Sequence, residues 1–310
     1  MESTEKSNTI SSTKEYSIFF KFFSLLSVVR GYNILIVAIA QYLGSIFIFS
    51  PNKTLKEVLF DLDLFFVVLA SVCVIAAGYI INNFYDAEKD KINRPVKAKI
   101  DSIVNQKTKL NIYFFLNFLG VIFGGIVSWR AALFFAVYIF LIWFYSHKLK
   151  KYPLTGLLSA SILSILPFFV IFVYYRNFSK VIFVHALFVF TVLLIRELVK
   201  QLENLEGDML LNYKTVPIRY GESFTKKLIT FLILLAFLPM YVLYTYPEIG
   251  YMKYYFYGTG IVLLIFTIVL WVNSTKKNYL LLHNIVKLVI IIGVFSLALI
   301  DTSVLIKRLL

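Results

Sequence analysis

Two polar segments of the sequence carry acids and amides at helical spacing where apolar stretches end. In the first, Asn82, Asp86 and Asp90 recur every four residues, so a helix would place them on one face. Carboxylate and amide oxygens suit Mg²⁺, which shares its shell with phosphate groups. Asn82 and Asp86 fall within the apolar stretch, where polar side chains are costly and usually functional. The segment therefore predicts a cation site, the alternative being a solvated helix end beside Lys89 and Lys91.

The second segment has similar chemistry. Gln201, Asn204 and Asp208 lie at i, i+3 and i+7 of a predicted helix, with Glu197 one turn deeper on the same face. Alone, this pattern is also compatible with an ordinary amphipathic helix end. Seven of the 17 acids of the chain, however, belong to the two segments. Two acidic helix ends with basic loops around them predict one shared metal–diphosphate site.

Basic and aromatic residues near these segments are candidates for binding diphosphate. Arg94 follows the first segment by one turn, and its guanidinium offers bidentate geometry. Tyr145 and Lys150 lie where another apolar stretch ends, and Lys200 interrupts the second acidic run. Each is weak evidence alone, because basic residues are common at one face of any membrane protein.

The composition indicates that a lipid bilayer surrounds the elements that position these residues. Sixty per cent of the 310 residues are hydrophobic and 15% are charged, against about 25% charged residues in soluble domains. The net charge of +14 is spread between apolar stretches, which argues for membrane topology and against a nucleic-acid partner. The single Cys73 excludes an intrachain disulfide and a multi-cysteine metal site, and the three histidines lack zinc spacing.

A transmembrane helix needs roughly 20 mostly apolar residues. The sequence contains nine such stretches, at about 22–49, 61–85, 109–128, 131–147, 154–175, 180–202, 225–247, 253–273 and 285–305. Arg30 and Asn33 are polar positions in the first stretch, either as helix–helix contacts or as cavity-lining residues. We expect residues 1–16 to form a flexible polar head and residues 17–310 to form one domain.

The distribution of Lys and Arg predicts the orientation of the chain. When each basic residue is assigned to its nearest loop, 23 of the 31 fall on the side of the N-terminus and eight on the other. Basic residues favour the cytoplasmic face. We therefore predict an integral protein of a bacterial-type inner membrane or plasma membrane, with a cytoplasmic N-terminus and an external C-terminus. Both acidic segments then lie on the cytoplasmic side.

At these motifs the chain resembles the UbiA superfamily of intramembrane prenyltransferases. Residues 82–90 are similar to the family pattern N-D-x-x-D-x-x-x-D, with Asn83 in place of the first Asp. The second pattern, D-x-x-x-D, falls on Asn204 and Asp208. The resemblance covers the first six spans and the helix count, and spans seven to nine add no motif.

Within that superfamily, residues 196–208 are similar to the branch that contains digeranylgeranylglyceryl phosphate synthases. That branch typically has acids where this chain has Gln201 and Asn204. An amide oxygen can still bind Mg²⁺ but lacks charge, so the departure affects the second metal and the substrate rather than the fold.

The resemblance implies an all-α protein whose nine transmembrane helices surround a central cavity, open to the cytoplasmic side and laterally to lipid. It further implies Mg²⁺-dependent transfer of a polyprenyl group from an allylic prenyl diphosphate to a lipid-soluble acceptor, such as a prenylglyceryl phosphate. The implied metal ligands are Asn82, Asp86, Asp90, Asn204 and Asp208, with the three aspartates catalytic. The implied diphosphate ligands are Arg94, Tyr145, Lys150 and Lys200, with Glu197 and Gln201 auxiliary and Asn33 lining the cavity.

Three other interpretations remain open at this point. The acceptor could be an aromatic quinone precursor instead of a prenylglyceryl phosphate. The chain could be a membrane transporter, because intramembrane acids also mark ion pathways. It could also bind prenyl lipid without turnover, as the uncharged Gln201 and Asn204 would allow.

Overall fold

The structure is a computed structural model that describes residues 17–302. Within this range nine helices are long and apolar enough to cross a membrane. They are α2 (Gly31–Gly44), continued by a π-helical turn (Ser45–Phe49), α4 (Leu62–Tyr85), α7 (Gln106–Val127), α8 (Trp129–His147), α9 (Pro153–Tyr175), α10 (Lys180–Glu203), α13 (Glu222–Thr245), α14 (Lys253–Val272) and α15 (Lys276–Ser296). The prediction of an all-α membrane protein with nine spans is confirmed.

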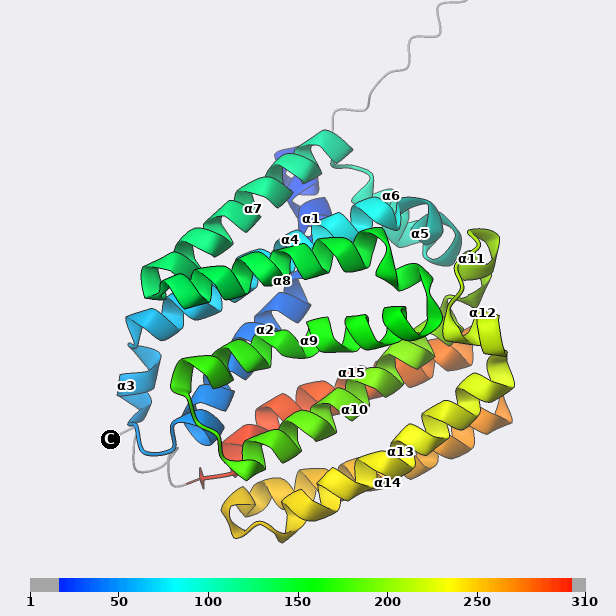
Figure 1. The fold of residues 1–310 in the computed structure, drawn as a ribbon. Coiled ribbons are helices and arrows are strands. Elements are labelled where there is room, and N and C mark those ends of the chain that lie inside the picture. The colour runs from blue at the N-terminus through cyan, green and yellow to red at the C-terminus, as the bar shows by residue number, and fades with distance from the viewer. Residues whose placement is uncertain (1–16, 303–310) are drawn as a thin grey trace, which may run out of the picture.

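Six of these helices form a closed ring. Along it, α2, α4, α8, α9, α10 and α15 each contact the next, and α15 returns to contact α2 (Figure 1). Outside the ring, α7 covers α4 and α8, α13 packs on α10, and α14 packs on α15. The chain thus encloses an interior between helices that are far apart in the sequence.

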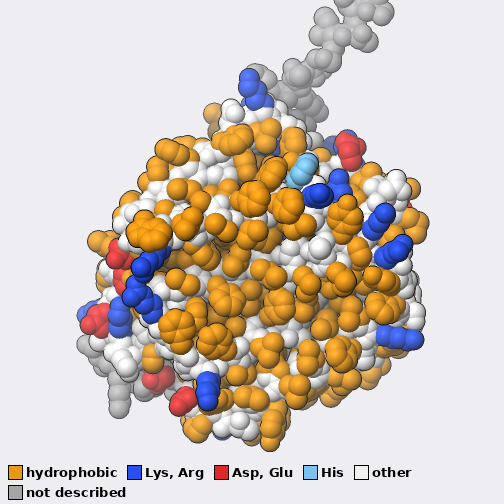
Figure 2. Space-filling view, viewed as in Figure 1, with side chains coloured by type: hydrophobic (Ala, Val, Ile, Leu, Met, Phe, Trp, Pro, Cys, Tyr) orange, Lys and Arg blue, Asp and Glu red, His pale blue; other side chains and the backbone are white. Residues whose placement is uncertain are grey.

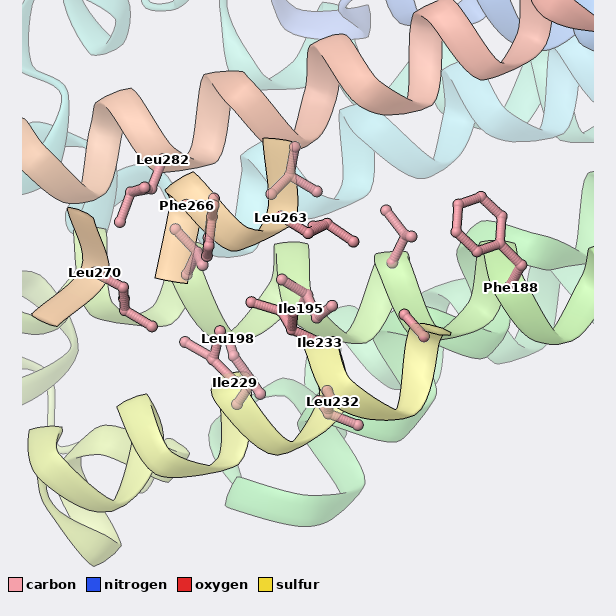
Figure 3. Packing of buried hydrophobic residues seen from close by; sticks show 14 of the residues in the cluster. Phe188, Ile195, Leu198, Ile229, Leu232, Ile233, Leu263, Phe266, Leu270 and Leu282 are labelled. Carbon is pink, nitrogen blue, oxygen red and sulfur yellow. The ribbon is translucent and has the colours of Figure 1, made fainter. Parts of the chain in front are cut away.

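Apolar packing fixes the ring on its α10 side. Figure 3 shows Ile195 of α10 among Ile233, Leu263, Phe266 and Leu282, which come from α13, α14 and α15. A second buried cluster joins α4, α8 and α9 on the opposite side. Because lipid is as apolar as these side chains, close packing rather than exclusion of water holds such helices together.

The α7 helix approaches the ring closely through two glycines one turn apart. A Cβ atom at Gly120 would lie 2.6 Å from Cγ2 of Val74, and one at Gly124 would lie 2.8 Å from Cδ2 of Phe135. Small residues at this spacing let transmembrane helices pack backbone against side chain. The two glycines therefore explain how α7 can cover α4 and α8 at once.

A proline inside α9 is accommodated by polar partners from the ring. Pro167 has no N–H group, so the carbonyl of Leu163 loses its helical donor. The Tyr138 hydroxyl donates to that carbonyl at 2.9 Å, and the Gln41 amide donates to the Pro167 carbonyl at 2.8 Å. Backbone groups freed within a membrane must be satisfied by such neighbours.

Two predicted helix boundaries are wrong. The first span is not continuous over 22–49, because Arg30 adopts a left-handed conformation (φ 52°) that separates α1 (Ile18–Val29) from α2. The last span begins at Lys276 and ends at Ser296, whereas 285–305 was predicted. The Thr275 side chain caps this helix by accepting from the Asn278 N–H, so a polar first turn belongs to the helix.

The short helices gather at the two ends of the bundle. At one end lie α5 (Ala87–Asn93), α6 (Pro95–Asp101), α11 (Leu205–Leu210) and α12 (Val216–Tyr220), and at the other lies α3 (Leu55–Leu59) (Figure 1). We call the first end the motif end. Figure 2 shows apolar side chains over most of one face, with charged side chains at its edges. This distribution suits a protein surrounded by lipid, while the predicted flexible head, residues 1–16, lies outside the described residues.

Candidate active site

The ring encloses a cavity of about 340 Å³ that reaches the motif end. All six ring helices contribute to its wall. Every residue predicted for the site lines it: Asn33, Asn82, Asp86, Asp90, Arg94, Tyr145, Lys150, Glu197, Lys200, Gln201, Asn204 and Asp208. The fold thus brings together two polar segments that lie more than a hundred residues apart in the sequence.

A break in the helix shapes the first segment. The α4 helix ends at Tyr85 and α5 begins at Ala87, with Asp86 at the junction (φ −94°, ψ 4°). One uninterrupted helix was implied and is not observed. Backbone hydrogen bonds from Asp86 to Asn82 and from Asp90 to Asp86 nevertheless preserve the turn spacing, so the three side chains still line one cavity.

The second segment is built in the same way. The α10 helix ends at Glu203, Asn204 occupies the junction (φ −98°, ψ 12°), and α11 follows. The amide oxygen of Gln201 accepts a hydrogen bond of 3.1 Å from the Val216 N–H. Gln201 therefore fixes the start of α12, a role that the proposed auxiliary function did not include.

Asn93 joins the two segments at the motif end. Its side-chain amide donates to the Asn204 carbonyl at 3.4 Å, and its oxygen accepts from the Gly207 N–H at 3.1 Å. A Cβ atom at position 207 would overlap the Asn93 side chain. The close approach of α11 to α5 thus requires glycine at this position.

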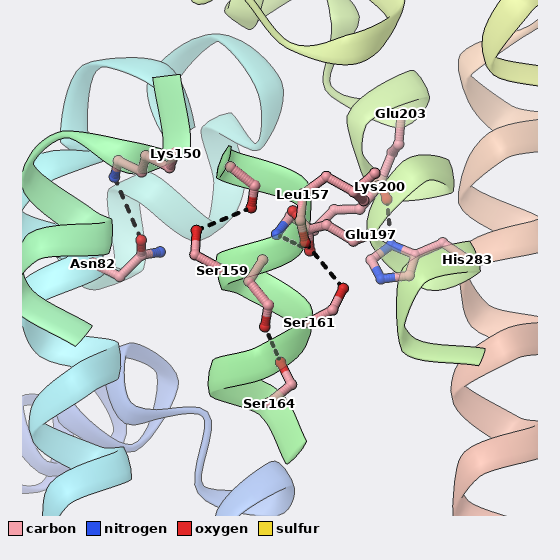
Figure 4. Close-up of polar contacts among 12 residues, drawn as sticks. Asn82, Lys150, Leu157, Ser159, Ser161, Ser164, Glu197, Lys200, Glu203 and His283 are labelled. Atoms are coloured by element: carbon pink, nitrogen blue, oxygen red, sulfur yellow. Dashed lines mark hydrogen bonds and ion pairs between the residues drawn. The ribbon is translucent and has the colours of Figure 1, made fainter. Parts of the chain in front are cut away.

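Lysine ammonium groups balance two of the three aspartates. Lys150 Nζ lies 2.6 Å from Oδ1 of Asp86 and 3.4 Å from Oδ1 of Asn82, as Figure 4 shows for Asn82. Lys89 forms an ion pair with Asp208, of which only 1% is exposed. The structure therefore places a positive charge against a carboxylate in each segment.

The charges around the cavity shift the pKa values of its aspartates in different directions. Burial disfavours ionised Asp86, but Lys150 and Lys89 outweigh it and lower the pKa of this carboxyl. Burial raises the pKa of Asp208, which Lys89 only partly offsets, and burial with the neighbouring Asp86 raises the pKa of Asp90. Burial also opposes the charge of Lys89, yet Asp86 and Asp208 raise the pKa of its ammonium. Lys89 thus stays charged between the two segments.

Two predicted diphosphate ligands are held by acids. Arg94 lies 2.9 Å from Glu203, whose other oxygen lies 2.5 Å from Nδ1 of His283. Lys200 lies 2.8 Å from Glu197 (Figure 4). Both basic residues still line the cavity, so these pairs position them at its wall.

The substitution in the first motif falls outside the cavity wall. The Asn83 amide donates to Asp101 at 2.8 Å, and its oxygen accepts from Lys109 at 3.1 Å. Asn83 therefore takes part in a buried network between α4, α6 and α7. Its replacement of the family's Asp leaves the donors around the cavity unchanged.

The oxygen donors of the cavity fit Mg²⁺ shared with a substrate. Among the described residues, no three His, Cys, Asp or Glu side chains form a metal cluster by themselves. Mg²⁺ is commonly bound by one or two carboxylates together with substrate phosphate. Asp86 and Asp208, with the amides of Asn82 and Asn204, supply this donor set, and the lysines beside both carboxylates show that these positions accept cations.

Several residues of the cavity wall could not be assigned from the sequence. Lys89 was treated as a feature of a solvated helix end, although its i+3 spacing from Asp86 allows both to share a face. Arg196 and Lys287 also line the cavity, as does Arg30, for which the sequence had left open a helix–helix contact or a place in the cavity wall. Lys287 lies within the last span, where no motif was found. The signal that could have identified it is a lone charge in an apolar stretch.

Comparison with known proteins bears on the identity of this site. The family model described as the UbiA prenyltransferase family matches residues 53–284. The digeranylgeranylglyceryl phosphate synthase of Pyrococcus horikoshii is 28% identical over 200 residues, 64% of this chain and 70% of that protein. The synthase of the same name from Sulfurisphaera tokodaii is 28% identical over 243 residues, 76% of this chain and 80% of the relative.

Solved structures share the fold. A structure described as digeranylgeranylglyceryl phosphate synthase in membranes matches with a TM-score of 0.67 and 21% identity, over 89% of this chain and 97% of that one. A UbiA homologue from Archaeoglobus fulgidus bound to GPP and Mg²⁺ matches with a TM-score of 0.65 and 15% identity, over 88% and 99% of the two chains. At these identities the likeness establishes the fold.

Proposed function

The chain belongs to the UbiA prenyltransferase family, and from that premise we propose that it transfers a polyprenyl group from an allylic prenyl diphosphate to a lipid-soluble acceptor. The observation that supports this reaction most directly is that Asp86 and Asp208, from separate segments, line one cavity beside lysine ammonium groups. Such an arrangement can bind a cation and a diphosphate together.

The oxygen donors of both segments would hold Mg²⁺: Asn82, Asp86, Asp90, Asn204 and Asp208. When bound, Mg²⁺ neutralises the negative charge that develops on the leaving diphosphate. Lys150 and Lys200 line the same wall, so their ammonium groups can donate hydrogen bonds to the diphosphate oxygens. Arg94 can do so with one edge of its guanidinium while Glu203 holds the group in place.

The deeper part of the cavity suits the allylic group. Tyr79, Tyr138, Ile142 and Leu163 line it, away from the motif end. Aromatic rings stabilise nearby cations, and apolar walls exclude the water that would otherwise capture an allylic cation. Once the carbon–oxygen bond to diphosphate has broken, the acceptor hydroxyl or ring carbon would form the new bond to the allylic carbon, and the proton it loses would pass to the released diphosphate.

We propose a prenylglyceryl phosphate, similar to geranylgeranylglyceryl phosphate, as the acceptor. The support is that the relatives from Pyrococcus horikoshii and Sulfurisphaera tokodaii are named as synthases of the digeranylgeranyl product. We also propose that the N-terminus and the motif end face the cytoplasm, because 23 of the 31 basic residues gather on that side.

The test is transfer by purified protein in lipid nanodiscs. Protein is incubated with a labelled prenyl diphosphate and, separately, a prenylglyceryl phosphate, a prenylglycerol or an aromatic acid, with Mg²⁺ or with EDTA. We expect labelled product with the prenylglyceryl phosphate and Mg²⁺ only. Absence of product with every acceptor would contradict the proposed reaction, and product from the aromatic acid alone would contradict the proposed acceptor.

A further inference from the structure

Three further basic side chains line the cavity besides those that pair with the acids of the two segments. Arg30 lies at the α1–α2 junction, Arg196 on α10 and Lys287 on α15. Within residues 17–302 none of the three forms an ion pair with a carboxylate. The other basic residues of the cavity wall that the sequence singled out are each held by one: Lys89, Arg94, Lys150 and Lys200. The guanidinium of Arg30 lies over the ring of Tyr79, 5.2 Å from its centroid. The three side chains thus lack a direct ion pair, and only more distant acids act on them: Asp90 on Arg30, Glu197 on Arg196 and Glu203 on Lys287.

Two of these charges lie well inside the transmembrane helices. Arg196 is seven residues from the end of α10 at Glu203, and Lys287 is eleven residues from the start of α15 at Lys276. At a rise of 1.5 Å per residue these separations are roughly 10 Å and 16 Å. Charged side chains at such depth are costly and usually face a partner or a functional cavity.

Arg30 and Arg196 also lie close enough to Lys287 to act on its charge. Arg196, Arg30 and Arg94 all repel the ammonium of Lys287, and Glu203 is the one acid among its main electrostatic partners. That acid is already hydrogen-bonded to Arg94 and His283. Three like charges that line one cavity without a direct ion pair are stabilised when an anion enters it. The arrangement therefore predicts an anionic ligand.

We infer that Arg30, Arg196 and Lys287 bind the phosphate monoester of the acceptor lipid, at a subsite separate from the one for the leaving diphosphate. This inference rests on the proposed function and adds the recognition of the acceptor. Two guanidinium groups can bind a phosphate through paired hydrogen bonds, and the ammonium supplies a point charge. The diphosphate, in contrast, belongs with the metal donors at the motif end.

The position of the trio also suits a lipid. Tyr32, two residues after Arg30, lines the cavity and is 59% exposed, so the cavity reaches the protein surface beside α2. Val37, Ile290 and Ile291 extend the wall along α2 and α15. These apolar residues give the chain of a lipid a path outward while its phosphate stays at the trio.

Steady-state kinetics of Arg196→Gln and Lys287→Gln test the subsite. Each variant loses a charged hydrogen bond to the phosphate, so we expect the KM for the acceptor to rise about 10-fold or more. The KM for prenyl diphosphate should change less than about 2-fold, since its ligands are intact. Lys287→Arg should recover most of the loss, and Lys226→Gln, on α13 outside the cavity, is the matched control. A rise in the KM for prenyl diphosphate alone would overturn the inference.

Binding without turnover separates this inference from the proposed reaction. The probe is an alkylglyceryl phosphate, compared with the same alkylglycerol lacking phosphate, titrated into protein in detergent without Mg²⁺ or prenyl diphosphate. We expect the phosphate lipid to bind about 10-fold more weakly to both Gln variants, with binding of the alkylglycerol unchanged. Equal binding of the phosphate lipid to wild type and variants would refute the subsite even if transfer is observed. If the variants bind the phosphate lipid more weakly as expected but the wild-type protein transfers no prenyl group, the subsite is upheld and the proposed reaction is refuted.

Discussion

Two aspartates at opposite ends of α4 allow the first motif to be tested by a matched pair of substitutions. Asp86 ends the helix in the cavity, whereas Asp61 begins it, accepting from the Leu64 N–H at 3.2 Å and from the Tyr174 hydroxyl at 2.8 Å. We predict that Asp86→Asn lowers Mg²⁺-dependent transfer by about 10²-fold or more, because a charge that stabilises the reacting centre is lost.

Asp61→Asn makes the same chemical change outside the cavity, and should leave transfer within a few-fold of wild type. The measurement is initial rate with labelled prenyl diphosphate at saturating Mg²⁺, in preparations with matched thermal stability. Full activity of Asp86→Asn would remove this carboxylate from the chemistry.

A single substitution can restore charge to the second motif. Asn204 lines the cavity one helical turn from Asp208, and its amide oxygen is uncharged. Asn204→Asp should tighten Mg²⁺ binding, so that half-maximal transfer needs several-fold less Mg²⁺. Asn212→Asp, at an exposed position just beyond α11, is the control. If Asn204→Asp instead lowers the maximal rate, the amide itself is required.

The acids and amides of the site could be predicted from sequence because helical spacing alone brings them to one face. Their partners could not. From the sequence, Lys89 looks like a loop residue. Its ion pair with Asp208 exists because α5 contacts α11 in the fold. Likewise, Asn83 matches the motif by position, but its side chain bonds to Asp101 and Lys109. Charge pairing depends on contacts between segments that are distant in the sequence, and the spacing of residues along one helix gives no information about such contacts.

At the scale of helices, the contact between α5 and α11 decides whether both motifs meet. Gly207 donates its N–H to Asn93 and leaves no room for a side chain. We predict that Gly207→Ala destabilises the protein by about 1–3 kcal/mol through overpacking. It should also raise the Mg²⁺ needed for half-maximal transfer, because Asp208 moves away from Asp86.

The control for Gly207→Ala is Gly258→Ala in α14, where an added Cβ would meet nothing within 4 Å. Alanine is the better helix former, so this variant should be as stable as wild type or more so. Thermal unfolding in detergent and Mg²⁺ titration of the rate give the two readouts. An unchanged midpoint and unchanged Mg²⁺ dependence for Gly207→Ala would show that this contact does not position the motifs.

Hydropathy predicts which segments form transmembrane helices, but it does not predict where a helix is interrupted. The first span reads as one apolar run, yet Arg30 turns left-handed and separates α1 from α2. A non-glycine residue rarely adopts this conformation without surrounding contacts. Here Ser24 and Ser27 of α1 donate hydrogen bonds to Ile100 and Asp101 of α6, which tie α1 to the motif end. Tertiary contacts thus override the local pattern.

For the whole molecule, the sequence predicted nine spans but not their order in space. The ring closes because α15 contacts α2, the last described span against the first. The two helices share no pattern that would pair them, since apolar surfaces of transmembrane helices are nearly interchangeable. For this reason the contribution of Lys287 to the cavity became visible only in three dimensions.

Orientation in the membrane is a property of the whole molecule. It can be tested by cysteine labelling, because the chain has a single native cysteine to remove. Cys73 is the only cysteine and is buried, so a Cys73→Ser background permits single reporter cysteines. Lys99 is exposed on α6 at the motif end, and Lys56 is exposed on α3 at the opposite end. The excess of basic residues on the side of α6 predicts that this side is cytoplasmic.

In intact cells, a membrane-impermeant maleimide should therefore label Lys56→Cys and spare Lys99→Cys, and permeabilisation should make Lys99→Cys reactive. A cytoplasmic motif end would place the diphosphate and Mg²⁺ donors where both charged substrates are water-accessible, while the apolar wall beside α2 and α15 meets lipid. Labelling of Lys99→Cys before permeabilisation, with Lys56→Cys protected, would invert the topology. The aspartates would then have to draw their substrates from the opposite side of the membrane.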